Sequence, residues 1–416
     1  MKHFLLSGSS IFILFISFLF SSCSKSDTSP KHSTTSLSIT SISQNTGPFN
    51  TSIIIYGVGF SSTISNDRAF INGKAATITA ASVTQLTVNI PLGAGTGDVS
   101  VSVNNSTAVS GPLFTYQLSA VVTTIAGSQT SGSTNGVGTA ATFEALWGIV
   151  MDASNNLYVS DGLLIRKITP DSTVSTFAGN SLTFVNPASL AIDATGNIYV
   201  ADVRSIRKVT PTGVVTTVAG SNYFNNSEFL GIVLDASGNI YASDIQNNVI
   251  LKITPSGTSS IFAGSGIAGS ANGTGTLASF NQPDGLGIDA AGNIYSADEG
   301  SNLIRKITPA GVVTTVAGNG TQGDADGSAG TSSFSSPTGV AVDATGNLYI
   351  GDFGNNKIRK ITPDGTVSTL AGSGVLGYSD GVGTAATFVS PNDLCIDKSG
   401  NIYVANGRDV RKITME

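Results

Sequence analysis

DASGNIYASD, from Asp235 to Asp244, is the stretch that decides the fold, because close copies of it occur six times in the chain. The other copies begin at Asp152, Asp193, Asp289, Asp343 and Asp397. Each copy joins two short β-type runs through a turn. A basic strand follows, and then a strand that ends in Ala-Gly. An internal repeat of this size is typical of a solenoid or a propeller.

The repeated positions indicate tight hairpins. An Asn stands in the turn of every copy, and a Tyr follows it two residues later, as in Asn239 and Tyr241. The residue before that Asn is Gly in five copies and Asn155 in the sixth. Gly and Asn both tolerate the positive φ that a tight β-hairpin needs. A Lys recurs in the basic strand, at positions 167, 208, 252, 306, 360 and 412.

These columns resemble NHL repeats, whose units fold as four-stranded propeller blades. One unit reads as strands at Leu230–Asp235, Ile240–Asp244, Val249–Thr254 and Thr258–Gly264. The first strand is almost entirely apolar, as expected for a strand covered on both faces. Residues 118–416 are therefore predicted to form a six-bladed β-propeller.

The two ends of the repeat region predict how the ring closes. The sixth repeat stops after Arg411-Lys412-Ile413-Thr414 and has no fourth strand. The segment Val121–Gly127, VVTTIAG, precedes the first repeat and copies VVTTVAG at Val214–Gly220. We expect this N-terminal strand clasp to complete the last blade, because closure removes exposed sheet edges.

A smaller all-β domain is predicted over residues 37–117. Alternating strands with regular turns, such as Ser52–Phe60 and Gln85–Pro91, suggest a small sandwich. Gly47-Pro48, Ile55-Tyr56-Gly57 and Ile71-Asn72-Gly73 are similar to the immunoglobulin-like IPT/TIG family. That resemblance implies either a spacer or a partner-binding module.

The N-terminus has the pattern of an export signal. Lys2 precedes an apolar run, and the signal is predicted over residues 1–22. The ending Leu19-Phe20-Ser21-Ser22-Cys23 resembles a bacterial lipobox, which implies a lipid on Cys23, and Phe20 departs from the usual aliphatic residue. Residues 23–36 would be a flexible tether. Ordinary secretion with an incidental Cys23 is the alternative.

The composition restricts the possible partners. Only 11% of the 416 residues are charged, 49 are Gly, and the formal net charge is −6. That suits short strands joined by many turns. Because no basic tract appears, nucleic acid is not expected as a partner. We expect a monomer held at the membrane by its lipid, in the outer membrane and facing the periplasm or the outside.

Loop lengths predict where a ligand binds. The connections that enter repeats one, four, five and six are longer than those that enter repeats two and three. We expect the long loops to wall one side of a face, because binding residues favour loops on a rigid scaffold. Besides Glu299, that face would present the candidate ligand-binding residues Trp147, Tyr223, Phe224, Asp284, Phe353, Tyr378, Asn392 and Asp393. Packing around the channel, for Trp147, and turn capping, for the acidic residues, are the alternatives.

Two further patterns bear on chemistry. Gly323-Asp324-Ala325-Asp326-Gly327 is similar to half a calcium loop, but it lacks the later carboxylate, so no cofactor is predicted and calcium stays an alternative. A second column has Asp at 161, 202, 244, 298 and 352 and Asn406 in the sixth repeat, and it is expected to pair with Arg at 166, 207, 305, 359 and 411. Leu251 breaks the Arg series in the third repeat.

No catalytic constellation is found. Related six-bladed propellers include lactonases and lyases, but His32 is the one His after the predicted signal, and it lies in the tether. The inner positions Trp147, Ala188, Leu230, Asp284, Thr338 and Asn392 are too apolar for a gluconolactonase-like ligand ring. We therefore expect a non-catalytic envelope protein that binds a glycan or a protein. A structural or assembly protein is the alternative, and a propeller hydrolase or lyase is a third reading.

Overall fold

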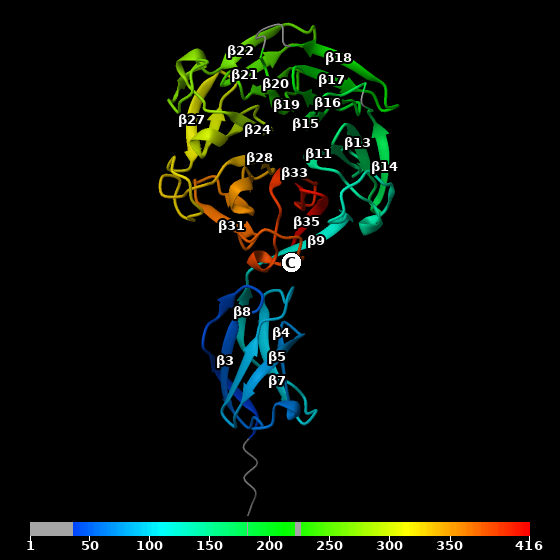
Figure 1. The fold of residues 1–416 in the computed structure, drawn as a ribbon. Coiled ribbons are helices and arrows are strands. Elements are labelled where there is room, and N and C mark those ends of the chain that lie inside the picture. Colours follow the sequence, from blue (N-terminus) through cyan, green and yellow to red (C-terminus); the bar gives the residue numbers. More distant parts are fainter. Residues whose placement is uncertain (1–35, 181, 221–225) are drawn as a thin grey trace, which may run out of the picture.

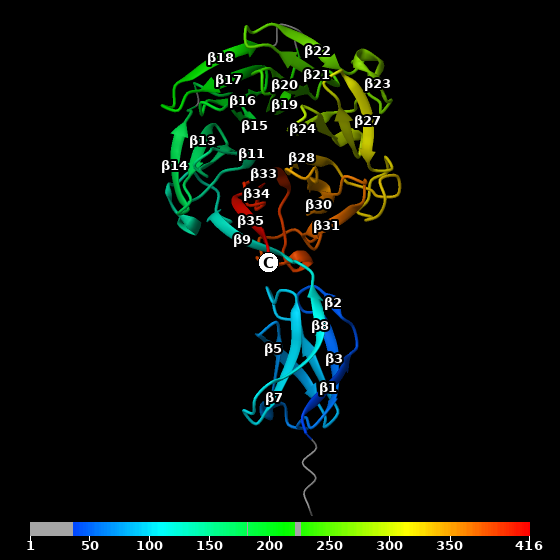
Figure 2. The same ribbon diagram turned by 180° about the vertical axis from the view of Figure 1, so that it is seen from behind.

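The computed structural model describes residues 36–180, 182–220 and 226–416. The predicted signal, Cys23, the tether up to residue 35, Tyr223 and Phe224 lie outside the described residues. Among the described residues, no helix is long and apolar enough to cross a membrane. Figure 1 shows a small β-domain beside a ring of sheets, and Figure 2 shows the same arrangement from behind.

The first domain is an eight-stranded sheet arrangement with strand order β1-β3-β6-β5-β4-β7-β8-β2. Alternate residues of its strands point inward, so that Ile53 and Ile55 of one strand and Leu86 and Val88 of its neighbour are fully buried. This confirms the predicted immunoglobulin-like domain. The strands are β1 (Ser38–Ile42), β2 (Thr46–Gly47), β3 (Ser52–Val58), β4 (Asp67–Ile71), β5 (Lys74–Ala81), β6 (Gln85–Asn89), β7 (Gly97–Val103) and β8 (Val109–Tyr116).

The ring is a six-bladed propeller, as predicted. Blades 1 to 5 each have four antiparallel strands in sequence order, and in all six blades the first strand lies nearest the central axis (Figures 1 and 2). Blade 1 consists of β11 (Leu146–Met151), β12 (Leu157–Asp161), β13 (Leu164–Ile168) and β14 (Thr173–Ala178). Blade 2 consists of β15 (Pro187–Ile192), β16 (Ile198–Asp202), β17 (Ser205–Val209) and β18 (Val215–Gly220). Blade 3 consists of β19 (Phe229–Leu234), β20 (Ile240–Asp244), β21 (Val249–Ile253) and β22 (Ser259–Ala263).

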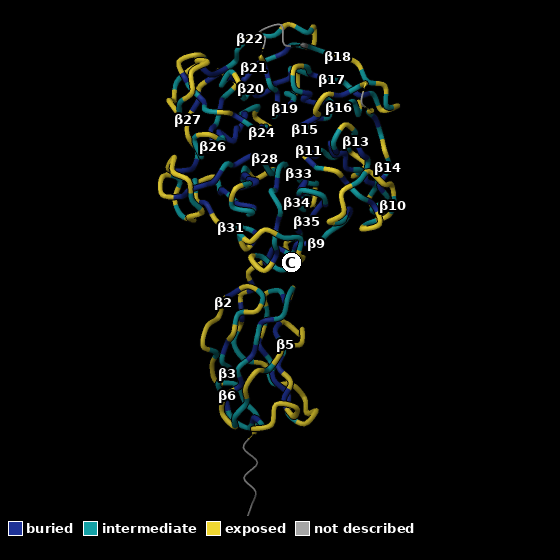
Figure 3. Tube along the Cα trace, viewed as in Figure 1, coloured by how far each residue is buried: buried dark blue, intermediate teal, exposed yellow. Residues whose placement is uncertain are grey.

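Blades 4 and 5 repeat this pattern, and blade 6 takes its outer strand from the other end of the propeller sequence. Blade 4 consists of β24 (Pro283–Ile288), β25 (Ile294–Asp298), β26 (Leu303–Ile307) and β27 (Val312–Ala317). Blade 5 consists of β28 (Pro337–Val342), β29 (Leu348–Asp352), β30 (Lys357–Ile361) and β31 (Val367–Ala371). Blade 6 consists of β33 (Pro391–Ile396), β34 (Ile402–Asn406), β35 (Asp409–Met415) and β9 (Ala120–Gly127). Side chains between neighbouring blades are buried, and the exposed residues lie mainly in the connections (Figure 3).

The predicted clasp is confirmed in its register. β9 pairs antiparallel with β35, with Val122 opposite Ile413 and Thr123 opposite Lys412. Val122 and Ala126 are buried, so the clasp contributes to the core as well as to the hydrogen bonding of the sheet.

The repeated turn residues are joined to one another by hydrogen bonds. In blade 3, Asp235 accepts a hydrogen bond from the Asn239 backbone N–H at 2.9 Å and another from the Asn239 side chain at 2.7 Å. The Tyr241 hydroxyl donates to the same carboxylate at 3.3 Å, and the Lys252 ammonium lies 5.4 Å from the Tyr241 ring centroid. The preceding Gly238 has the positive φ that was predicted. The residues that recur in every repeat therefore stabilise the scaffold. Any specificity for a ligand must come from residues that differ between the repeats.

Part of each long loop adds to the outer edge of the blade it enters, as β10 (Gly136–Val137), β23 (Gly273–Thr274) and β32 (Gly381–Val382), with a single bridge from Gly327 to Val367 in blade 5. Other parts of the loops reach the turn between the second and third strands, where the Asn355 side chain donates to the Gly323 carbonyl oxygen at 2.7 Å. Sequence spacing identified the extra length correctly, and the wall that the long loops were expected to form stays a prediction.

The two domains meet beside the clasp. The Tyr116 hydroxyl donates to the Glu416 carbonyl oxygen at 3.2 Å. Ser119 and Glu416 exchange two backbone hydrogen bonds, of 2.8 and 2.9 Å. The C-terminal end of the propeller is thus tied to the end of the first domain, an arrangement that suits a spacer.

One turn in blade 2 is strained, and this gives a first prediction. Val203 has a φ of +46°, whereas the corresponding positions of blades 1 and 6 are Gly162 and Gly407. A left-handed conformation costs an L-residue about 1–2 kcal/mol. We expect Val203→Gly to raise the free energy of unfolding in urea by about 1 kcal/mol. The reverse change, Gly162→Val, should destabilise the protein, and a destabilised Val203→Gly variant would contradict the strain.

Candidate functional site: a cavity at one mouth of the central channel

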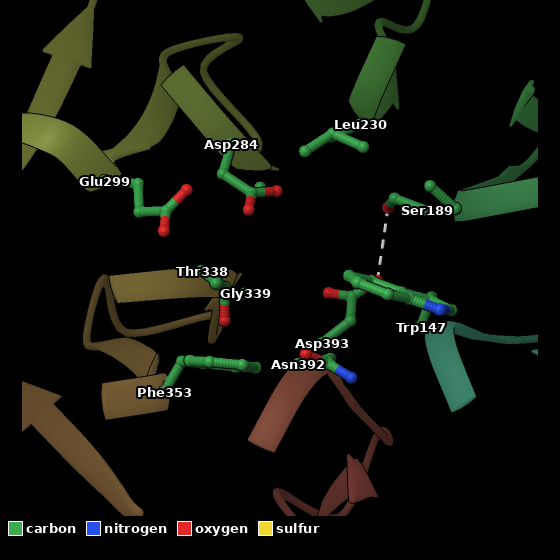
Figure 4. A pocket seen from close by; sticks show the side chains of 12 residues that line it. Trp147, Ser189, Leu230, Asp284, Glu299, Thr338, Gly339, Phe353, Asn392 and Asp393 are labelled. Carbon is green, nitrogen blue, oxygen red and sulfur yellow. Dashed lines mark hydrogen bonds between the residues drawn. The ribbon is translucent and has the colours of Figure 1, made fainter. Parts of the chain in front are cut away.

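A cavity of about 220 Å³ lies at the propeller axis, at one end of the inner strands (Figure 4). Its wall is formed by the second residue of every inner strand, together with the first turn residue after β25 and after β29. These residues are Trp147, Ala188, Leu230, Asp284, Thr338, Asn392, Glu299 and Phe353. None of the residues lining the cavity belongs to the long loops.

Close approach of the inner strands keeps this cavity small. A side chain at Gly231 would place its Cβ 2.3 Å from the Asp284 carbonyl oxygen, and one at Gly285 would place it 2.4 Å from that of Thr338. Gly148 and Gly339 are equally tight against the next inner strand. Glycine is therefore required at the third position of these strands, and the backbones themselves narrow the channel.

Asp393 and Ser189 replace this glycine in the two remaining blades, and they meet across the channel. The Ser189 hydroxyl donates to Asp393 Oδ2 at 3.2 Å, and the Ile149 backbone N–H donates to the same oxygen at 3.3 Å. Burial raises the pKa of Asp393 to about 6, although its hydrogen bonds from Leu394, Ile149 and Ser189 oppose that rise. Asp393 thus links blades 6, 1 and 2 and forms part of the cavity floor.

Asp284 has a different environment. The carboxyl group is half-buried and makes no hydrogen bond with the residues that the structure describes. Burial raises its pKa to about 8, and the negative charges of Glu299, Asp393 and Glu228 add to that rise. At neutral pH the group can therefore be protonated, and it can then donate a hydrogen bond as well as accept one.

Aromatic and amide groups complete the wall. Trp147 is 41% exposed, and Figure 4 shows it on the far side of the cavity from Glu299 and Phe353. The Asn392 side chain donates to the Leu146 carbonyl oxygen at 2.6 Å, which leaves its Oδ1 buried without a partner. The cavity thus offers flat apolar surfaces beside unpaired acceptors. No Lys or Arg is among the described residues that line it.

Five of the predicted ligand-binding residues converge on this cavity, namely Trp147, Asp284, Phe353, Asn392 and Asp393. Tyr378 does not line it. Its hydroxyl lies near Gly407, beside the last turn of blade 6, where burial and the charge of Asp409 raise its pKa. Ser189 was not among the predicted residues. Its position, the third of the inner strand, is Gly in four of the six repeats, and this departure was a usable signal.

The carboxylates of the calcium-like run are engaged by cations of the protein. Lys357 donates to Asp324 at 2.7 Å, and Arg359 donates to Asp326 at 2.7 Å. Within the described ranges, no group of three or more His, Cys, Asp and Glu residues is placed to hold a metal ion. The predicted Asp–Arg pairs form in blades 1, 4 and 5, as Asp161–Arg166, Asp298–Arg305 and Asp352–Arg359.

The raised pKa of Asp284 gives a second prediction. Its folded pKa of about 8 exceeds the ordinary value of 3.8, so the folded chain holds a proton that the unfolded chain releases. The associated stability is present below about pH 4 and is lost as the pH rises through about 8. We expect Asp284→Asn to become increasingly more stable than the wild type as the pH rises.

Thermal melts of both proteins between about pH 5 and pH 9 measure this difference. The exposed Asp98→Asn change controls for the loss of one negative charge. A difference between Asp284→Asn and the wild type that does not vary with pH would contradict the proposed environment of Asp284.

The fold and the cavity define an all-β protein in which an immunoglobulin-like domain precedes a six-bladed propeller with an axial site. Comparison with known families gives these parts their names. Residues 37–116 match the IPT/TIG domain, residues 334–361 match the NHL repeat, and residues 177–236 match the teneurin NHL domain. The chain therefore combines an IPT/TIG domain with NHL repeats, as the sequence columns predicted.

Solved structures share this architecture. A protein of unknown function from Bacteroides thetaiotaomicron is 24% identical, with a TM-score of 0.63, and the match covers 91% of this chain and 98% of that one. An auxiliary nutrient binding protein from the same species is 19% identical, with a TM-score of 0.66 and the same coverage, 91% and 98%. A protein of that description from Bacteroides ovatus is 20% identical, with a TM-score of 0.60, again covering 91% and 98%. These likenesses show the fold.

A curated relative matches part of this chain. The chloroplastic protein SUPPRESSOR OF QUENCHING 1 of Arabidopsis thaliana is 34% identical over 163 residues. That match covers 36% of this chain and 15% of the length of the plant protein.

Proposed function

We propose that this protein is a non-catalytic lipoprotein of the bacterial cell envelope, and that its axial cavity binds a small neutral or amine-bearing saccharide. The observation that carries the proposal is the pairing of the exposed Trp147 ring with the unpartnered carboxyl group of Asp284 in one cavity. An aromatic face can stack on a sugar ring, and carboxyl groups bind its hydroxyls.

The size and charge of the cavity restrict the ligand class. A cavity of about 150 Å³ holds a benzene ring, so about 220 Å³ accommodates one sugar ring. Three carboxyl groups, of Asp284, Glu299 and Asp393, line the cavity, and no cationic side chain lines it among the described residues. Without a cation to pair with, phosphorylated sugars and uronic acids are disfavoured. Neutral sugars or amino sugars fit it better.

The similar structures give the proposal a context. Two Bacteroides proteins of the same architecture are described as auxiliary nutrient binding proteins. A lipid on Cys23, the tether up to residue 36 and the IPT/TIG spacer would together hold the cavity away from the outer membrane. The lipid anchor, the outer-membrane location and the monomeric state all belong to this proposal. Protease shaving of intact cells would show which side of that membrane the propeller faces.

The single Trp of the chain makes the proposal testable, since any fluorescence of Trp147 reports directly on the cavity. We expect neutral mono- and disaccharides or amino sugars to change that fluorescence in a saturable way, and Asp284→Ala or Phe353→Ala to weaken binding by roughly tenfold or more. Trp147→Ala should abolish binding measured by calorimetry.

Tyr378→Ala, which alters an aromatic residue outside the cavity, is the matched control. Binding that survives Trp147→Ala would refute the site. A protein that binds no glycan in an array but recovers envelope proteins in a pull-down would instead be an assembly protein. Turnover of a lactone or a peptide amide by the pure protein would make it an enzyme.

A further inference from the structure

The outer edges of the six blades are not equivalent. In blades 1, 4 and 6, a short strand from the entering loop covers the outermost strand, and in blade 5 a single bridge does so. The outermost strands of blades 2 and 3, β18 and β22, have no further strand beside them among the described residues, and Figure 2 shows both at the outer rim.

The four covered edges use one recognition pattern. In each blade, a buried Arg of the third strand reaches the covering segment and donates two hydrogen bonds to it. One goes to a backbone carbonyl oxygen and the other to the side-chain oxygen of the next residue, an Asn or Asp followed by Gly. The acceptors are Thr134 and Asn135 for Arg166, Ala271 and Asn272 for Arg305, Ala325 and Asp326 for Arg359, and Ser379 and Asp380 for Arg411.

Two residues of the outer strand complete this pattern. A Thr opposite the Arg donates to the same Asn or Asp side chain, for example Thr369 to Asp326 at 3.1 Å and Thr124 to Asp380 at 2.9 Å. A Val two residues earlier pairs with the covering Gly, and the covering segment buries it to 1% exposure in all four blades. These are Val174, Val313, Val367 and Val122.

Blade 2 keeps all three residues of this pattern, but no covering segment lies beside its outer strand among the described residues. Arg207, Thr217 and Val215 occupy the three positions, in the same register. Arg207 makes no hydrogen bond or ion pair with the described residues, and its side chain is half-buried, whereas the four other Arg are fully buried. Asp202, only 1% exposed, has an unpartnered Oδ2. The corresponding oxygens of Asp161, Asp298 and Asp352 accept from the Arg of their own blades.

The other open edge, that of blade 3, does not carry this set of residues. Its three corresponding residues are Leu251, Ile261 and Ser259, so the cation, the Thr hydroxyl and the apolar Val are all replaced. The open edge alone therefore does not require Arg207, Thr217 and Val215. Their presence in blade 2, beside the buried and unpartnered Oδ2 of Asp202, points to a covering segment that comes from elsewhere and brings Arg207 into the arrangement of the other blades.

We propose that the outer strand of blade 2 binds an extended peptide segment of a partner protein, in which an Asn or Asp is followed by Gly. The segment would add a short antiparallel strand at Val214 and Val215. Its Asn or Asp side chain and the preceding carbonyl oxygen would accept hydrogen bonds from Arg207. Strand addition to an open edge is an established mode of peptide recognition. β18 carries no Lys or Pro that would prevent it. Val214, 56% exposed, marks the place where the segment would lie.

The chain supplies its own probe for this inference. A fluorescent synthetic peptide with the sequence of residues 131–141, SGSTNGVGTAA, reproduces the covering segment of blade 1. We expect it to bind the full-length protein and to protect the amides of Val215–Thr217 from hydrogen exchange, with no change at Ser259. Arg207→Leu introduces the residue found at Leu251 of blade 3, so the fold should tolerate it.

Anisotropy titrations distinguish the outcomes. Arg207→Leu, or a peptide in which Asn135 is replaced by Ala, should weaken binding by at least about tenfold, because a charge-assisted hydrogen bond is lost. Absence of binding by the wild type, or binding that Arg207→Leu leaves unchanged, would overturn the inference. If the wild type forms a dimer that Arg207→Leu dissociates while the peptide does not bind, the edge belongs to a second copy and the peptide proposal fails.

Discussion

A propeller that begins at residue 128, and so lacks the clasp strand β9, is expected not to form a stable closed ring. β9 supplies the outer strand of blade 6 and buries Val122 and Ala126 against β35 and the neighbouring blade. Burial of a Val side chain contributes about 1.5–3 kcal/mol, and burial of the Ala126 methyl group contributes about 0.8 kcal/mol. The backbone hydrogen bonds of a whole strand are lost as well. The sum is comparable with the roughly 5–15 kcal/mol of net stability of a typical domain.

The matched control is the same propeller begun at residue 118, which keeps β9 and removes only the first domain. We expect this control to melt cooperatively. The chain begun at residue 128 should melt at least about 10 °C lower or show no cooperative transition. Closure by the clasp would be wrong as an explanation of stability if the two melts coincided.

The sequence was sufficient for the ring because each of its features is local or repeated. Gly238, Asn239 and Tyr241 report one hairpin, and five sister copies confirm that their spacing is not accidental. The clasp was predictable for the same reason, since Val121–Gly127 is a displaced copy of a strand that the last repeat lacks. The second residue of every inner strand could then be assigned to the mouth of the channel.

The parts that sequence could not predict depend on contacts between distant segments. The long loops were assigned to the face, and the sequence did not predict that pairs such as Gly136 with Val174 would attach part of each loop to a blade edge. Tyr378 was grouped with Trp147 because both were expected on the face that carries the entering loops, and only coordinates show that Tyr378 lies beside Gly407 instead of lining the cavity. The bridge from Asp393 to Ser189 joins blades 6 and 2, and although both residues stand in one repeat column, that column does not show that their side chains meet.

Arg359→Leu is the substitution expected to have the largest effect of any single change at the blade edges. The guanidinium is fully buried, and it donates to Asp352 at 2.7 Å, to Asp326 at 2.7 Å and to the Ser333 carbonyl oxygen at 3.1 Å. It also lies 5.3 Å from the Phe334 ring centroid. Its removal leaves the carboxylate of Asp352 buried without its cation. Breaking a buried pair in this way costs about 3–5 kcal/mol.

Arg207→Leu makes the same chemical change at the corresponding position of blade 2. Comparing the two variants separates the contribution of the buried ion pair to stability from that of the Arg side chain itself. Because Arg207 has no partner among the described residues, we expect its replacement to alter the free energy of unfolding in urea by less than about 1 kcal/mol. Adding Asp352→Asn to Arg359→Leu should recover part of the loss, since the uncompensated charge is then removed. Equal effects of Arg359→Leu and Arg207→Leu would show that the buried pair does not stabilise the blade. They would also remove the contrast between occupied and empty edges, because an Arg without a partner would then contribute as much as one with four.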